Sequence, residues 1–349
     1  MNAMMRLIIG GLVLSFLIGC TDSNDPNPGA VNVPSVQGHQ YLSDYGFFDD
    51  LANLIPNSEA GVIPYDLNVP LFSDYALKKR FIYVPDGIQI PYNESETLEL
   101  PVGSVLIKNF YYNQNGTDNR IETRLLIRKT EGWHPELYIW NEDQTDAERS
   151  VVGGTRELEI EVNGGTEIFN YLIPNQNQCK NCHGNNGVIE PIGPKIPNLN
   201  RDYTYVDGTS NQLEKWNQNG ILELPNDVNS ISKWAEVNDA SASLNERARA
   251  YLASNCSSCH RRHGSAANSG LYLEYNNTDS LSSGYWKTPV AAGDGSGGLD
   301  YVIKPGSAEE SILYYRMNSR EVEVRMPEIG RDLIHTEGVQ LIKEWIDNM

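Results

Sequence analysis

Over the first half of the chain, hydrophobic and polar positions alternate in a way that predicts β-strands. Over 156–162 the apolar residues would share one face of a strand and three glutamates the other. Asn163-Gly164-Gly165 then supplies a hairpin turn before a return strand over 167–173. Shorter β-branched or aromatic runs precede this hairpin at 80–84, 102–112, 121–128 and 137–140. We therefore expect an antiparallel β-domain over residues 41–172, either a sandwich or a barrel.

Farther along the chain, apolar residues recur at helical spacing. Ser243, with Glu246 three residues later, has capping-box spacing and should begin a helix. Thr336 should begin another, whose apolar residues form one broad face: Val339, Leu341, Ile342, Trp345 and Ile346. Shorter helices are expected over 211–219, where Leu213 and Trp216 would be buried, and over 305–317. The expected fold class is α+β and multidomain, with mainly α-helical domains after the β-domain.

The amino terminus has a different pattern. Arg6 precedes an apolar run that is too short to span a bilayer and that ends in Leu17-Ile18-Gly19-Cys20. This ending is similar to a bacterial lipobox, in which the signal is cut before a cysteine that receives lipid. The alternative is an ordinary secretory signal with Cys20 as a bystander. We predict a lipoprotein signal peptide over residues 1–19 and a polar, flexible tether over residues 20–40.

The net charge of −19, from 46 acidic and 27 basic residues, argues against nucleic acid as a partner. Phosphate binding relies on clustered lysine and arginine, which an acidic chain of this kind does not offer. One interpretation of the charge is attraction to a basic redox partner. The other is that an acidic surface only keeps an exported protein soluble.

The candidate chemistry lies in two copies of the motif C-x-x-C-H, Cys179-Lys180-Asn181-Cys182-His183 and Cys256-Ser257-Ser258-Cys259-His260. Two cysteines three residues apart can form thioethers with one haem, and the histidine that follows then lies under the iron as its proximal ligand. A redox disulfide or a zinc site would leave both histidines unexplained, and structural zinc ribbons bring their cysteine pairs closer together in sequence.

Cysteine use agrees with this interpretation, because the motifs take four of the five cysteines and the lipobox takes the fifth. We therefore expect two covalently attached c-type haems. Haem 1, with iron bound by His183, would belong to a segment over 173–240. Haem 2, with iron bound by His260, would belong to a domain over 241–349.

The two segments differ in what they offer as a second axial ligand. In the second, Met326 precedes Pro327 in a loop and is favoured over Met317, which lies four residues after Leu313 at ordinary core spacing. The first contains no methionine and no second histidine. His134, expected in a loop, is the leading candidate from outside the segment for the iron of haem 1. The commoner explanation for such a residue is a solvated loop histidine.

With these residues in place, the chain resembles a family of bacterial diheme c-type cytochrome lipoproteins. The resemblance is carried by the strings PYDLNVPLFSDYA, LPVGSVLIKNF, RIETRLLI, YIWNEDQTDA, IPNQNQCKNCH, PIGPKIPNLNRD, RARAYLASNCSSCH and RMPEIGR. It implies two haems, export, and a carboxyl-terminal domain like class I cytochrome c, in which the first and last helices cross. By the same analogy, Thr21 after the lipid-bearing cysteine implies the periplasmic side of the outer membrane in a host with two membranes.

The expected function is that of an exported, lipid-anchored diheme cytochrome that carries electrons between redox partner proteins of the cell envelope. One alternative is a redox enzyme, in which haem 1 has an open face for peroxidase-like or small-molecule chemistry. Another is a docking subunit of a partner dehydrogenase. The chain shows no Ser-His-Asp arrangement, phosphate loop or catalytic carboxylate pair. The sequence therefore favours a carrier over an enzyme, and we assign no catalytic residue.

Overall fold

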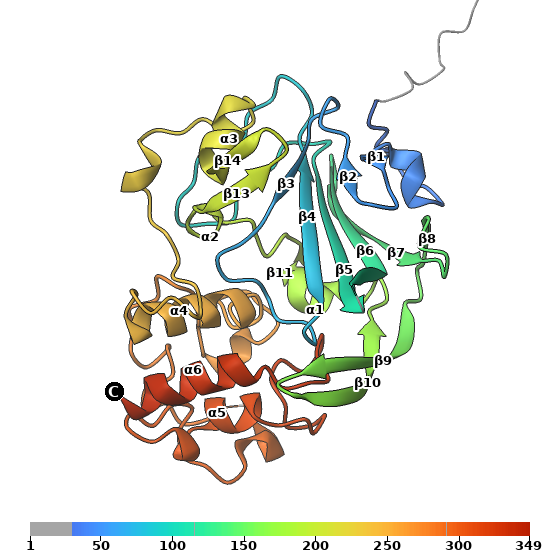
Figure 1. The fold of residues 1–349 in the computed structure, drawn as a ribbon. Coiled ribbons are helices and arrows are strands. Elements are labelled where there is room, and N and C mark those ends of the chain that lie inside the picture. Colours follow the sequence, from blue (N-terminus) through green and yellow to red (C-terminus); the bar gives the residue numbers. More distant parts are fainter. Residues whose placement is uncertain (1–29, 115, 291) are drawn as a thin grey trace, which may run out of the picture.

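The structure is a computed structural model that describes residues 30–114, 116–290 and 292–349 (Figure 1). The predicted signal peptide and Cys20 lie outside these residues. None of the helices in the described ranges is long and apolar enough to cross a membrane.

A six-stranded antiparallel sheet is the largest element, and its strands lie side by side in chain order. They are β3 (Val62–Tyr65), β4 (Leu77–Tyr83), β5 (Val105–Gln114), β6 (Thr117–Lys129), β7 (Gly132–Trp140) and β8 (Ala147–Arg149). The predicted strands of this region are confirmed in position. The prediction of a sandwich or barrel is wrong, because the strands form one open sheet with β3 and β8 at its edges.

Different parts of the chain cover the two faces of this sheet. One face packs on the segment that carries η1 (Leu42–Tyr45), β1 (Phe48–Asp50) and β2 (Ile55–Pro56). Val31 and Val33 also pack here, so the ordered chain begins before residue 41. The other face packs on residues that follow the first motif, with Leu213 and Trp216 fully buried as predicted. The central strands therefore bury apolar residues on both faces.

The expectation of mainly α-helical haem domains is wrong. Over 173–240 the chain forms α1 (Cys179–His183), α2 (Ile196–Leu199) and α3 (Gln212–Gln218), all short. Between them lie two small hairpins, β11 (Gly184–Asn185) with β12 (Val188–Ile189), and β13 (Asp202–Tyr205) with β14 (Gly208–Asn211). Strand accounts for 28% of the chain and helix for only 20%, so no helical bundle forms. Prolines at 191, 194 and 197 and the Asn-Gly turn at Asn186 explain why longer helices cannot form here.

The carboxyl-terminal region contains two longer helices, α4 (Leu244–Asn255) and α6 (Thr336–Asp347), together with the short α5 (Ile312–Met317). The capping box of Ser243 and Glu246 is confirmed. Helix α6 buries its predicted apolar face against α4. The expected helix over 305–317 is interrupted, because η5 (Ala308–Glu310) ends before α5 begins. Irregular chain with the turns η2 (Val228–Ser230), η3 (Ala267–Ser269) and η4 (Gly293–Ser296) makes up much of the rest.

The strand region and the carboxyl-terminal region are joined by polar contacts. The Ser254 hydroxyl donates to the Val69 carbonyl at 2.6 Å, and the Phe72 amide donates to Asn255 Oδ1 at 2.7 Å. The predicted hairpin, β9 (Gly154–Val162) with β10 (Gly165–Ile173), forms a separate two-stranded sheet that packs on side chains of the main sheet, such as Tyr112, and on Leu333. The end of α4, which leads into the second motif, is thus fixed to the loop before β4.

Candidate functional site

The first motif forms the whole of helix α1, directly after β10. Within the described chain the Cys179 and Cys182 thiols are in no disulfide. The hairpin of β11 and β12 brings the carbonyl of Glu190 to 2.8 Å from Nδ1 of His183. A carbonyl can only accept, so Nδ1 carries the hydrogen and donates it, and Nε2 is left as the basic nitrogen. Burial lowers the pKa of His183 to about 4, which keeps the imidazole neutral.

The second motif begins where α4 ends. The Cys256 amide donates to the Leu252 carbonyl at 2.9 Å, and the His260 amide donates to the Cys256 carbonyl at 2.9 Å, so the motif forms a further turn. The His260 ring hydrogen-bonds the backbone of Leu271, and burial lowers its pKa to about 4. Each motif thus presents two thiols free of disulfides and one half-buried, neutral histidine whose ring has a hydrogen-bond partner.

The two motifs lie against each other. The thiols of Cys182 and Cys259 interact, which lowers the pKa of Cys259 and raises that of Cys182. Cys259 Sγ also lies 3.4 Å from the carbonyl oxygen of Asn181. The Ser265 hydroxyl donates to the same carbonyl at 2.9 Å. Residues far apart in sequence therefore form one site, and nothing in the spacing of either motif predicts this contact.

No known relative identifies this site. No family model, no curated protein and no solved structure matches the chain. Within the described ranges, no group of three or more His, Cys, Asp and Glu side chains is arranged to hold a metal ion. The residues and their geometry therefore carry the functional argument.

The two candidate methionines have different surroundings. Met317 is 6% exposed and packs in the core between α4, α5 and α6. Met326 is half-buried in the loop before α6, and its amide donates to the Arg316 carbonyl at 3.0 Å. The same loop faces the second motif, since Glu328 influences the pKa of Cys259 and Arg331 that of Cys256. Met317 is thus a core residue, as expected, and the role of Met326 as a ligand stays a prediction.

Arg331 fixes this loop, and sequence reasoning missed it. The residue is 5% exposed, and its guanidinium donates to backbone carbonyls on both sides of the loop. The contacts include Met326 at 2.8 Å, Ser319 at 3.0 Å and Met317 at 3.3 Å. Burial lowers the pKa of Arg331 to about 10. Its only signal in the sequence is a charge at the end of RMPEIGR, and such a charge is usually exposed.

The expected loop position of His134 is wrong, because the residue lies within β7. Its Nε2 is 3.1 Å from Glu131 Oε1, and its side chain is 37% exposed. His134 and Leu137 are three positions apart on β7, so their side chains point to opposite faces of the sheet. Because Leu137 pairs directly with Arg124, His134 lies on the face opposite that arginine. Arg124 influences the pKa values of Cys179 and His183, which places α1 on its own side of the sheet. The described residues show no contact between His134 and the first motif.

Proposed function

We propose that this protein is a diheme c-type cytochrome that carries electrons in the cell envelope. The observation that carries the proposal is the direct contact between the two C-x-x-C-H motifs, in which Cys259 Sγ lies 3.4 Å from the Asn181 carbonyl oxygen. Two haems attached to touching motifs would lie close together, and electron transfer between cofactors becomes faster as their separation falls. A pair of this kind suits transfer from one partner protein to another.

The residues present fit this group. The free thiols at each motif can form two thioethers, and each histidine directs a hydrogen-bonded, neutral ring whose other nitrogen can bind iron. When bound, a haem supplies one-electron chemistry, and the protein sets its orientation and potential. We propose Met326 as the second ligand of haem 2, with its loop held by Arg331. His134 is not needed for this proposal.

The same proposal includes export. A signal over 1–19 and a lipid on Cys20 would anchor the protein at the periplasmic face of the outer membrane. This agrees with the attachment of c-type haem, which takes place outside the cytoplasm. Cys20→Ser should then release the protein from membranes. A wild-type protein that is released without detergent and has a free Cys20 thiol would rule this part out, independently of the haem count.

The test of the haem proposal is direct. The protein is produced with the c-type maturation machinery and examined by denaturing mass spectrometry and a pyridine haemochrome assay. We expect two covalently bound haems per chain. Zinc without haem in protein made this way would end the proposal.

The enzyme alternative has one observation in its favour. The segment over 173–240 supplies no second axial ligand to haem 1, since it contains neither methionine nor a second histidine. An open iron would bind carbon monoxide in the reduced protein, and one CO per chain would support the enzyme function. No CO binding would leave electron transfer alone.

A further inference from the structure

Three like charges cross the central sheet in direct register. Arg80 on β4 pairs with Lys108 on β5, and Lys108 pairs in turn with Arg124 on β6. Directly paired residues point to the same face, where like charges repel and destabilise a sheet. Lys78 lies two residues before Arg80 on the same face and pairs with Phe110. We call these four cations, Lys78, Arg80, Lys108 and Arg124, the cation cluster.

Neighbouring carboxylates neutralise only part of this cluster. Asp66 Oδ1 accepts from Arg80 Nη1 at 2.5 Å, but its other oxygen lies 3.8 Å from Arg201, so two arginines share one carboxylate. Glu122 pairs with Arg124 through both of its oxygens. Arg124 therefore has its counterion, whereas Arg80 has only a share of one.

Neither lysine of the cluster forms an ion pair with a carboxylate of the described residues. Lys78 Nζ donates to the Ala76 carbonyl at 2.8 Å, and Lys108 Nζ lies 4.8 Å from the centre of the Phe110 ring. Burial lowers the pKa of Lys78 to about 7 and that of Lys108 well below its usual range, and Arg80 and Arg124 add to both shifts. Nη2 of Arg80 is also buried without a hydrogen-bond partner.

This arrangement is unusual in a chain with a net charge of −19, in which carboxylates outnumber lysines and arginines. A partly buried group of cations with too few counterions is unfavourable unless an anionic group joins it. The register of three strands creates the arrangement, so it is a property of the fold and not of one flexible side chain.

The cation cluster faces the first motif. The Tyr171 hydroxyl, near the end of β10 that leads into α1, donates to Glu122 Oε1 at 2.7 Å, and Glu122 is the counterion of Arg124. Figure 1 shows α1 beside one end of β4 and β5, in agreement with this contact. A haem carries two propionate carboxylates at one edge of its ring. A haem attached to the first motif would bring two negative charges to this side of the molecule, where Lys78 and Lys108 form no ion pair.

We propose that the cation cluster binds the propionate groups of haem 1. This inference rests on the proposed function, because it requires haem at the first motif. The cluster has a second consequence for the iron. Positive charge nearby disfavours the ferric state, so the cluster raises the potential of haem 1.

The test uses the mature diheme protein with Lys108→Met and Lys78→Met. Lys79→Met is the matched control, because Lys79 lies on the opposite face of β4 and pairs with Asp118 at 3.1 Å. Each variant is examined by haem count, by spectroelectrochemical titration, and by resonance Raman spectroscopy of the propionate bending bands. Lys108→Arg, which keeps the charge, reports on any loss that comes from packing alone.

We expect two haems in every variant. In Lys108→Met one of the two potentials should fall by about 59 mV, a tenfold change in the oxidised-to-reduced ratio, with a shifted propionate band. Lys78→Met should shift the same potential by less, while Lys79→Met and Lys108→Arg should match the wild type.

Unchanged potentials and propionate bands in both lysine variants would overturn the inference and leave the proposed function intact. A free anion is the other source of negative charge. If added nitrite shifts the Soret band of the wild type but not of Lys108→Met, and the propionate bands are the same in both, the cluster binds a small anion and the inference is wrong. Absence of haem from the wild type would instead remove the proposed function itself.

Discussion

The two C-x-x-C-H motifs have the same pattern of residues but different structural support. The second follows a twelve-residue helix that has a capping box and packs on α6. The first is itself a five-residue helix with no fully buried residue, followed by two-residue strands. Helices this short are not stable by themselves. The carboxyl-terminal core therefore preorganises the second motif. The first motif depends on the neighbouring sheet and, under our proposal, on haem 1.

The charged residues beside the two motifs also differ in how far the chain itself supplies their partners. Arg331, beside the second motif, donates its hydrogen bonds to backbone carbonyls. It therefore fixes a loop and needs no ligand as a partner. Lys78 and Lys108, on the side of the first motif, form no ion pair within the described residues. The chain thus supplies the partners of Arg331, whereas under our proposal the propionates of haem 1 would supply those of the two lysines.

The largest expected effect comes from removing one attachment site. Cys179→Ser with Cys182→Ser should remove one of two haems, because thioether attachment needs these thiols. The carboxyl-terminal core should keep the second haem, since α4 and α6 do not rely on the first motif for packing. Denaturing mass spectrometry gives the haem count. Loss of both haems would show that the second motif is not independent.

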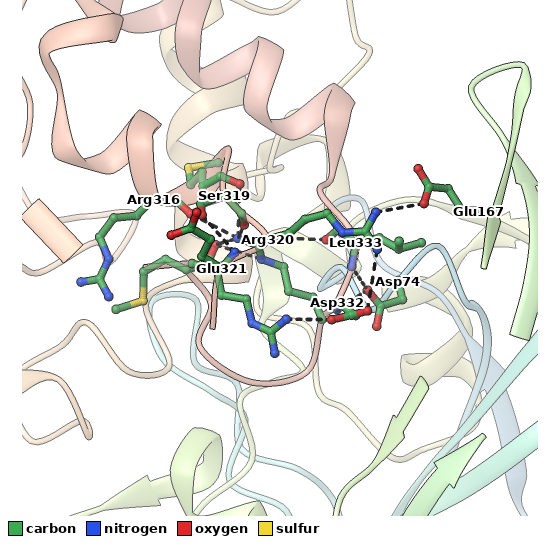
Figure 2. Close-up of polar contacts among 12 residues, drawn as sticks. Asp74, Glu167, Arg316, Ser319, Arg320, Glu321, Asp332 and Leu333 are labelled. Carbon is green, nitrogen blue, oxygen red and sulfur yellow. Dashed lines mark hydrogen bonds and ion pairs between the residues drawn. The ribbon is translucent and has the colours of Figure 1, made fainter. Parts of the chain in front are cut away.

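Arg331→Met should destabilise the protein by about 3–5 kcal/mol, because it leaves several buried carbonyls without donors. Arg320→Met is the control, since Arg320 is 44% exposed and forms a surface ion pair with Glu167 at 3.0 Å (Figure 2). The control should cost less than about 1 kcal/mol. Urea unfolding measures both values. Equal losses in the two variants would contradict the role given to Arg331.

Substitution of each candidate methionine should distinguish the iron ligand from the core residue. Met317→Ala should cost about 2–5 kcal/mol of stability, as expected for a methionine truncated in a packed core. Met326→Ala should cost less stability, but it should abolish the weak thioether-to-iron band at the red end of the oxidised spectrum and lower one potential. Absorbance and unfolding are measured on the same samples. If Met317→Ala removes the band instead, the assignment of the ligand is wrong.

The smallest effect concerns His335, at the junction between the sheet and the carboxyl-terminal region. Its ring stacks on Phe72 at 4.3 Å and hydrogen-bonds the Tyr251 hydroxyl at 3.0 Å, and burial lowers its pKa to about 4. Between pH 6.5 and 4 the unfolded chain binds the proton more readily than the folded one, so stability falls as pH falls through this range.

We expect His335 to contribute about 1 kcal/mol to the stability lost between pH 7.5 and 5.5. His335→Gln should remove this part of the pH dependence, as measured by urea unfolding at the two pH values. The same slope in both proteins would show that His335 is not the titrating group.

Local patterns predicted much of the fold. The hairpin turn at Asn163-Gly164-Gly165, the capping box at Ser243 and the apolar face of α6 each depend on residues close in sequence, and each is present. The fold class was wrong because the motif segments were expected to form helical domains. In the segment over 173–240, proline and asparagine-glycine turns limit every helix to a few residues.

The sequence predicted which residues form the site but not how they are arranged. The motifs identify the thiols and histidines, but the contact between Cys182 and Cys259 depends on how distant segments fold together. The cation cluster depends on the register of three strands, which alternation within one strand does not reveal. Arg331 looks like any surface arginine until its carbonyl partners are known.

The central claim is that two haems occupy motifs that touch. Circular dichroism of the Soret band in the oxidised diheme protein tests it most directly, because two haems in close proximity couple their transitions. We predict a band with positive and negative lobes in the wild type, replaced by a band of one sign when Cys179→Ser and Cys182→Ser remove haem 1. A wild-type protein with two haems whose Soret band has one sign, unchanged in shape by that substitution, would contradict the account.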